Sequence, residues 1–298
     1  MTMASKRQVP GYYRQQVGNS IVTAIYDGYI NLASSLFHGI DNDRMQMLIN
    51  QKHQTQTPEG VPTAVTTYLI DDGTSKTLLN AGGASGTMGN IQENLRVSGY
   101  APEDINAILL THMHFDHICG LVDKDGNVAF PNATIYVSED ESGFWLDPKN
   151  AEAAPVGNKS FFEMAVNSVK PYKNAGRFHA FAGNAEVLPG IKAITSHGHT
   201  PGHTSFLISS GEEQLLLWGD IVHSHALQFL HPEVTNDFDT DQPQAAATRS
   251  FIFKMAAEEN LMIAGDHLPF PGFGYLQKES RGYAWIPVEY APLAEMID

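Results

Sequence analysis

The sequence of 298 residues has one cysteine, few basic residues and no long apolar run. A single cysteine, Cys119, excludes an intramolecular disulfide and a zinc site built from several thiolates. Lys and Arg total 18 against 33 Asp and Glu, which leaves a formal net charge of -15. This shortage of positive charge disfavours nucleic acid and an anionic membrane surface as partners, because both are bound through basic residues. A small neutral substrate suits such a surface better than an anionic one.

The apolar runs are also too short for a membrane span, which needs about 20 residues. The first residues, MTMASKRQVP, lack the apolar core of a signal peptide, so we expect a cytoplasmic protein. Hydrophobic residues make up 42% of the chain and charged residues 17%, as in an ordinary globular protein. No linker of low complexity, charge block or short repeat divides the chain. We therefore predict one domain over residues 1–298, with residues 1–10 as a flexible tail.

Hydrophobic periodicity predicts both strands and helices. Residues 66–70 and 76–80 are predicted to form a hairpin whose turn contains Gly73. Residues 90–97 are predicted as an amphipathic helix and residues 107–110 as a short buried strand. Further strands are predicted at 19–26, 133–137, 191–195, 205–208 and 214–218, and further helices at 159–169 and 244–259. The order therefore mixes hairpins with helices.

A cluster of metal-ligand side chains follows the strand predicted at 107–110. The segment T-H-M-H-F-D-H contains His112, His114, Asp116 and His117. In an extended stretch, residues two apart point to the same side, so His112 and His114 can bind one ion. Asp116 and His117 can then bind a second. The alternative is a set of unconnected surface or core histidines, which suits a lone histidine better than a cluster at this spacing.

Three later segments supply the groups that a site with two metal ions still lacks. They are H-T-P-G-H at 199–203, W-G-D at 218–220 and G-D-H at 265–267. Each lies at or after the end of a predicted strand, where loops collect functional residues. The whole series, H-x-H-x-D-H, T-P-G-H, G-D and a late His, resembles the metallo-β-lactamase superfamily.

This resemblance implies an α/β fold of the four-layer αββα sandwich type, with the site at the edge of the sandwich. It also implies a ligand set for two metals. The first metal would be held by His112, His114 and His203, the second by Asp116, His117 and His267, and Asp220 would bridge both.

Five imidazoles and two carboxylates without a thiolate favour zinc, and they are also compatible with manganese, iron or cobalt. Two divalent ions lower the pKa of a shared water to about 7, so we expect a metal-bridging hydroxide as the nucleophile. The predicted catalytic residues are Asp116, Asp220 and His223. His223 follows the bridging Asp220 by three residues and is a candidate to contact a leaving group or pass a proton; the alternative is a packed or solvated histidine.

Other stretches resemble the methyl parathion hydrolase group and its lactonase-like relatives within this superfamily. Among them are P-G-Y-Y-R at 10–14, F-P-N-A at 130–133 and S-H-G-H-T-P-G-H-T at 196–204. The resemblance implies hydrolysis of lactones or aryl esters with a secondary organophosphate (phosphotriester) hydrolase activity, and homodimers occur often in the group. The main alternative is an acyl-homoserine lactone lactonase, which would need a groove for an acyl chain.

Aromatic side chains are the candidates for a pocket that selects a small neutral aromatic ester, lactone or phosphotriester. A bulky Phe238 beside His223 would narrow the space for a tetrahedral phosphotriester and leave room for a flat lactone. More than half of the aromatic candidates are expected to belong to the core instead. The candidates are Phe144, Trp145, Phe161, Phe162, Phe229, Phe238 and Phe273.

Three departures from the family pattern refine the expectation. Asp220 stands where β-lactamases of this fold usually have a cysteine, so β-lactam hydrolysis is not favoured. Asn80 stands where many members have an aspartate, which changes the support behind the ligands. Cys119 replaces a frequent glycine, and a small buried side chain explains it best.

Two other functions are disfavoured. A thioesterase or nucleic-acid-processing enzyme of the family would bind an anionic substrate, and this chain has few basic residues. A non-enzymatic metal-binding role is disfavoured because no ligand of the family pattern is missing.

Overall fold

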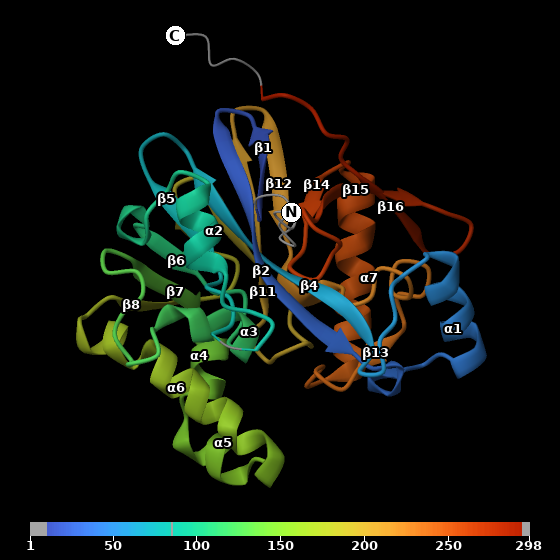
Figure 1. The fold of residues 1–298 in the computed structure, drawn as a ribbon, viewed down its shortest axis with the longest axis horizontal. Coiled ribbons are helices and arrows are strands. Elements are labelled where there is room, and N and C mark those ends of the chain that lie inside the picture. The colour runs from blue at the N-terminus through green and yellow to red at the C-terminus, as the bar shows by residue number, and fades with distance from the viewer. Residues whose placement is uncertain (1–10, 85, 294–298) are drawn as a thin grey trace, which may run out of the picture.

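The structure is a computed structural model that describes residues 11–84 and 86–293. The tail predicted at residues 1–10 lies outside the described residues. Within the described ranges, the strands form two seven-stranded sheets and one two-stranded ribbon. Figure 1 shows the two large sheets in the middle of the molecule, with helices on either side.

The first sheet combines an antiparallel half with a parallel half. β1, β2, β4 and β5 pair antiparallel, and β5, β6, β7 and β8 pair parallel. Parallel strands bring their carboxyl ends to one edge of a sheet, and binding sites form at that edge. In spatial order the strands are β1 (Tyr12–Val17), β2 (Ser20–Leu32), β4 (Val61–Asp71), β5 (Lys76–Leu79), β6 (Ala107–Leu109), β7 (Thr134–Ser138) and β8 (Phe178–Phe181).

The second sheet is antiparallel apart from the parallel pair β12 and β14. Its spatial order is β16 (Tyr283–Pro287), β15 (Phe273–Lys278), β14 (Met262–Ala264), β12 (Glu213–Leu217), β11 (Thr204–Ser210), β10 (Ile191–Thr195) and β9 (Glu186–Leu188). The ribbon pairs β3 (Phe37–His38) with β13 (Thr235–Asn236).

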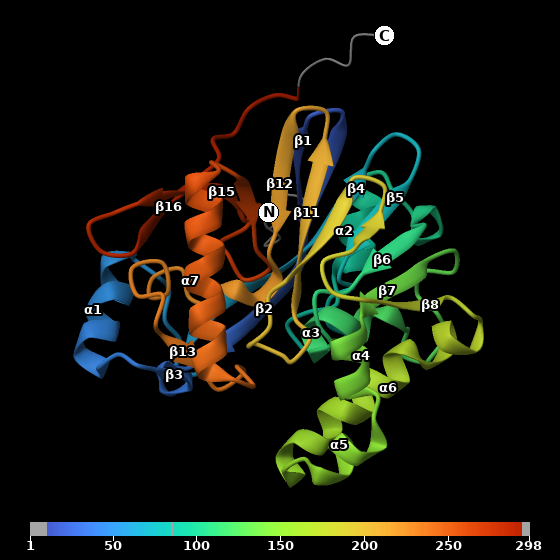
Figure 2. The same ribbon diagram turned by 180° about the vertical axis from the view of Figure 1, so that it is seen from behind.

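Seven α-helices lie among the described residues. α7 covers the outer face of the second sheet, as Figure 2 shows from behind. α5 and part of α6 extend away from the body of the molecule in both views. The helices are α1 (Asn42–Gln51), α2 (Ile91–Val97), α3 (Phe115–Ile118), α4 (Glu139–Trp145), α5 (Pro148–Ala153), α6 (Lys159–Asn174) and α7 (Gln242–Glu258).

Alternation along the central strands produces the layers. In β6, Ile108 packs into the cluster between the first sheet and its helices, whereas Leu109 packs between the two sheets. In β12, Leu217 lies between the sheets and Leu216 packs toward α7. Successive side chains of a strand point to opposite faces, so both faces of each sheet are buried. This confirms the four-layer αββα architecture.

Most of the predicted elements are present, with different lengths. The hairpin of β4 and β5, the helix α2 and the strand β6 lie where the sequence predicts them. The strand predicted at 19–26 continues to Leu32, because it pairs with β4 along that whole length. The helix predicted at 159–169 continues to Asn174, and Tyr172 in its last turn is fully buried. In the described part of the chain, no helix is both long and apolar enough to cross a bilayer.

Candidate metal centre

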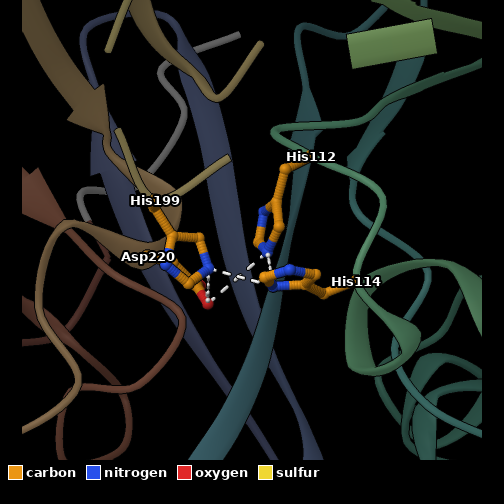
Figure 3. Close-up of side chains that lie close together, drawn as sticks. All are labelled: His112, His114, His199 and Asp220. Atoms are coloured by element: carbon orange, nitrogen blue, oxygen red, sulfur yellow. Dashed lines mark hydrogen bonds and ion pairs between the residues drawn. The ribbon is translucent and has the colours of Figure 1, made fainter. Parts of the chain in front are cut away.

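Histidine and aspartate side chains converge where the two sheets meet, and they form four overlapping groups among the described residues. Within each group the ligand atoms all lie within 4.8 Å of one another. Figure 3 shows one group at close range. The groups are His112, His114, His199 and Asp220; Asp116, His117 and His267; Asp220, His223 and His267; and His117, Asp220 and Asp266.

The segment after β6 supplies four of these side chains. The backbone leaves the strand at Leu109 and enters α3 at Phe115. His112 and His114 lie in the extended part, and their Nε2 and Nδ1 atoms are 3.1 Å apart. Asp116 and His117 lie in the first turn of α3, where the helical geometry directs them to a different group. The change from strand to helix inside the motif therefore divides its side chains between two places.

Asp220 connects those two places. It follows Gly219, which has a positive φ of 60° and whose position leaves no room for a Cβ, since that atom would lie 2.8 Å from His203 Nε2. Asp220 Oδ2 is 3.3 Å from His199 Nε2 and 3.1 Å from His267 Nε2. Asp220 Oδ1 is 3.2 Å from His117 Nε2. One carboxylate thus reaches nitrogen atoms of both groups.

The groups contain six of the seven predicted ligands; they also include His199, and they leave out His203. His199 Nε2 is 3.0 Å from His114 Nδ1, inside the first group. Both ring nitrogens of His203 have other partners: Nε2 accepts the Asp220 backbone N–H at 3.1 Å, and Nδ1 lies 2.8 Å from Ser196 Oγ. The ring of His203 still lies beside the cluster, with its centroid 5.2 Å from that of His112 and 5.7 Å from that of His199, so its ligand role stays a prediction.

In most of these histidines, the ring nitrogen that points away from the cluster contacts a hydrogen-bonding group of another residue. Asp239 Oδ1 is 2.9 Å from His199 Nδ1, and the carbonyl oxygen of Ala64 is 2.9 Å from His267 Nδ1. Such contacts fix the ring orientation and the position of the proton. Sequence reasoning missed Asp239, because it lies 40 residues from His199 in the chain and belongs to no local motif.

Asn80 acts on His117 through Asp266. Asn80 Nδ2 donates to Asp266 Oδ2 at 2.6 Å, and the same oxygen lies 3.2 Å from His117 Nδ1. Asn80 also accepts the backbone N–H of Thr111, just before the first histidine of the motif. The aspartate-to-asparagine difference noted in the sequence therefore places a neutral donor beside a buried carboxylate.

Burial and neighbouring charges shift the ionisation of the cluster. Burial lowers the pKa of His112 and His114 well below the ordinary value, which favours the neutral imidazole that binds metals. Burial alone would raise the pKa of Asp220, but the nearby His117 and His267 lower it below the ordinary range. Burial alone would lower the pKa of His117 and His267, but the Asp220 carboxylate raises it. The cluster therefore combines neutral imidazoles at His112 and His114 with histidines that are paired to an ionised carboxylate.

Two buried atoms test whether the residues fit metal ions. His117 Nε2 and Asp220 Oδ1 lie 3.2 Å from each other, but neither atom makes a hydrogen bond in the described part of the chain. Leaving buried polar atoms without partners costs free energy, and native proteins rarely do so. Both atoms are nitrogen or oxygen donors of the kind that divalent transition metals bind. The residues therefore fit a pair of divalent cations.

A cavity of about 630 Å³ opens beside the cluster. Asp116, Asp220, His223 and His267 form its polar end. Its apolar side comes mainly from α4 to α6, and five of the predicted aromatic residues line it. These are Phe144, Trp145, Phe161, Phe162 and Phe238.

Two predicted pocket residues belong to the core instead. Phe273 packs between the two sheets, with its ring centroid 5.3 Å from that of Tyr68, because alternation along β15 directs it inward. Phe229 stacks on Phe253 of α7 at 5.3 Å, in the layer outside the second sheet. Neither is among the described residues that line the cavity.

Comparisons with known proteins agree with this geometry. Residues 60–267 match the family described as the metallo-beta-lactamase superfamily. The chain is similar to AbOPH, a hydrolase in the beta lactamase superfamily, with 38% identity and a TM-score of 0.91 over 96% of this chain and 100% of that one. It is also similar to AidC, a dizinc quorum-quenching lactonase solved with a product, with 27% identity and a TM-score of 0.86 over 95% and 99%.

A curated relative, the N-acyl homoserine lactonase of Bacillus cereus, is 31% identical over 123 residues. The match covers 41% of this chain and 40% of that protein, so the chain spans about two fifths of this relative's length.

Proposed function

The chain belongs to the metallo-β-lactamase superfamily, and from that premise we propose that it is a metal-dependent hydrolase with a dinuclear centre that cleaves neutral lactones or aryl esters. The observation that carries this proposal is the position of Asp220. Its two oxygens lie 3.1 to 3.3 Å from nitrogens that belong to different ligand groups. A carboxylate placed in this way suits a bridge between two cations.

Three imidazoles would hold one ion, and two imidazoles and a carboxylate would hold the other. His112, His114 and His199 form the first set, and Asp116, His117 and His267 form the second. The donor set favours zinc, and the dizinc relative AidC supports that choice. When bound, two such cations lower the pKa of a water molecule and polarise a carbonyl oxygen.

His223 supplies a proton donor at the wall of the cavity. Asn236 Nδ2 donates to His223 Nδ1 at 3.2 Å, and the Asn236 amide is oriented because its Oδ1 accepts the Phe238 backbone N–H. The His223 proton is then on Nε2, which lies 3.2 Å from Asp220 Oδ2. Burial lowers the pKa of His223 to about 4, so the ring is neutral near pH 7. This N–H suits hydrogen bonding to the leaving oxygen of an ester.

The apolar side of the cavity favours a flat, uncharged substrate. Aromatic rings from α4 to α6 bind aryl and acyl groups by burial of apolar surface. Phe238 stacks on His223, with ring centroids 6.0 Å apart, and leaves less room for a tetrahedral phosphotriester at that end. Organophosphate hydrolysis is therefore proposed as a secondary activity, which the likeness to AbOPH supports.

Acyl-homoserine lactones are the second candidate substrates. Their lactone ring would meet the polar end of the cavity, and the acyl chain would lie along the aromatic side. Likeness to AidC over almost the whole chain favours this candidate.

The proposed substrate preference, lactones and aryl esters before phosphotriesters, is tested by measuring kcat/KM on one zinc-loaded preparation. Dihydrocoumarin, phenyl acetate, methyl parathion and a series of acyl-homoserine lactones of increasing chain length are the substrates. We expect the lactones and the aryl ester to exceed methyl parathion, and activity to be lost with a chelator and restored by zinc. A preference for methyl parathion above about tenfold, or 1.4 kcal/mol in transition-state binding, would overturn the ordering. A steep rise of kcat/KM with acyl length would favour the second candidate.

A further inference from the structure

A buried carboxylate outside the metal ligands joins three parts of the site. Glu141 lies in the first turn of α4 and is 0% exposed. Its neighbours belong to segments that are far apart in the chain. They are the loop of the first two histidines, the H-T-P-G-H loop and the aromatic side of the cavity.

All four groups that contact this carboxylate are hydrogen-bond donors. Glu141 Oε1 accepts the Met113 backbone N–H at 2.8 Å and the Trp145 indole N–H at 2.7 Å. Glu141 Oε2 accepts the Thr200 hydroxyl at 2.6 Å and the Gly202 backbone N–H at 2.9 Å. Four donors fill the acceptor positions of an ionised carboxylate. The surroundings therefore suit an ionised carboxylate better than an amide.

The two loops held in this way carry metal ligands. Met113 stands between His112 and His114, and Thr200 follows His199. The H-T-P-G-H loop also approaches α4 closely: a Cβ at Gly202 would lie 2.0 Å from the Glu141 backbone nitrogen. The Ser138 hydroxyl, at the start of α4, donates to the Gly202 carbonyl oxygen at 2.7 Å. The start of α4 therefore fixes one loop against the other.

Trp145 extends this network to the cavity. Its indole ring lies edge-on to the His114 ring, with centroids 5.5 Å apart, and packs against Phe162 at 4.7 Å. The carboxylate that orients the indole is also the one that holds the backbone between the two histidines. A change in the position of Glu141 would therefore move both the aromatic side of the cavity and the loops that carry the metal ligands.

We propose that Glu141 is a positioning residue that holds the aromatic side of the cavity in register with the two metal-ligand loops. The expected effect on KM rests on the proposed function, whereas the expected effect on zinc affinity does not. Glu141 lies outside the ligand groups among the described residues, and it acts through Met113, Thr200 and Trp145.

Three variants separate the two halves of this role. E141Q replaces one carboxylate oxygen with an amide NH₂, which cannot accept hydrogen bonds. The variant therefore loses the bonds either to Met113 and Trp145 or to Thr200 and Gly202. W145F removes the indole donor and keeps a ring in the wall. T200V removes one donor from the H-T-P-G-H loop at nearly constant volume. The measurements are zinc affinity of metal-free protein by chelator competition, and kcat and KM for phenyl acetate.

We expect E141Q to weaken zinc binding by about 10- to 100-fold and also to raise KM. T200V should weaken zinc binding by about tenfold with little change in KM, since a hydrogen bond to a charged group is lost. W145F should raise KM by about fivefold and leave zinc affinity unchanged. This separation is a result that a purely structural role would not produce.

D27N is the matched control. Asp27 is also 0% exposed and accepts backbone N–H groups of Gly83, Gly89, Asn90 and Ile91, but it contacts neither ligand loop. D27N should lower the melting temperature and leave zinc affinity and KM within about twofold.

The proposal is overturned if E141Q changes only the melting temperature, as D27N does, or if D27N weakens zinc binding as much as E141Q. If E141Q does not fold, T200V and W145F still test the proposal. It is contradicted if T200V and W145F change zinc affinity by the same factor and also change KM by the same factor. The zinc titration needs no substrate. If the wild-type protein binds zinc but hydrolyses neither lactones nor aryl esters, the proposed function is refuted, and the zinc titration still tests the role of Glu141 in metal binding.

Discussion

The ligand cluster and the aromatic side of the cavity lie next to each other but are built differently. The ligands come from both sheets, at the ends of β6, β10, β12 and β14, and all of them except the partly exposed His114 are almost completely buried. The aromatic side comes mostly from one continuous segment, α4 to α6, with Phe115 of α3 and Phe238 added from elsewhere. The cluster therefore depends on how the two halves of the fold meet, whereas the aromatic side depends on one helical arm.

The forces also differ. In the cluster, charges and hydrogen bonds act at low effective dielectric, so a single lost partner is costly. Along the arm, contacts are apolar and their contributions follow the area that they bury. Changes in the cluster should alter metal binding and the rate of the chemical step, and changes in the arm should alter substrate affinity.

Removal of the shared carboxylate should produce the largest difference between the two regions. D220A deletes the one side chain that reaches both ligand groups, so kcat/KM should fall by at least about 10³-fold. Elemental analysis should show less zinc per chain. D125N, in an exposed loop, is the control and should match the wild type. Full zinc content and activity in D220A would disprove the bridging assignment.

The two histidines of the H-T-P-G-H loop should behave in opposite ways. H199A removes a ligand atom from the first group and should lower kcat/KM by about 10²-fold, together with zinc affinity. H203A leaves the Asp220 N–H without its acceptor and should cost about 1–3 kcal/mol of unfolding free energy, with zinc content retained. Kinetics, zinc analysis and denaturant unfolding distinguish them. Loss of zinc in H203A, with zinc retained in H199A, would support the ligand role predicted for His203 from the sequence.

A smaller effect is expected behind His117. N80D puts a second carboxylate beside Asp266 in place of a donor, and like charges repel strongly at a buried position. The affinity for the second zinc should fall by about tenfold, and the first zinc should be unaffected. Stepwise zinc titration of metal-free protein measures both. A uniform loss at both sites would show that Asn80 supports the whole cluster and not His117 alone.

The smallest catalytic effect is expected on the helical arm. F161A removes a half-buried ring that lines the cavity, so KM for phenyl acetate should rise by about two- to tenfold with kcat little changed. F229A is the contrasting variant, because this ring belongs to the core. It should lower the unfolding free energy by about 3–5 kcal/mol and leave KM unchanged. A rise of KM in F229A would place that ring in the pocket after all.

Much of the fold and the site could be predicted because the signals are local. The strand β6 and the H-x-H-x-D-H motif are adjacent in the chain, so side-chain alternation alone indicated which ligands lie together. The choice between His199 and His203 was different. Both follow the same strand, and the turn between them, packed against Glu141 through Gly202, sets how each ring approaches the cluster.

The aromatic residues show the same limit. Phe238 and Phe273 are alike in composition and hydrophobicity, yet one lines the cavity and the other fills the space between the sheets. Residue type predicts burial, but it does not predict in which of several apolar layers a ring is buried.

The sequence by itself determined the donor types, their grouping around one strand end and the acidic surface that favours a neutral substrate. Only the tertiary structure decided that His199 joins the first ligand group, which rings form the cavity and which carboxylates, Asp239, Asp266 and Glu141, hold the ligands in place. The reason is physical: ligand chemistry is a property of single side chains, whereas convergence depends on contacts between residues that lie tens to hundreds of positions apart.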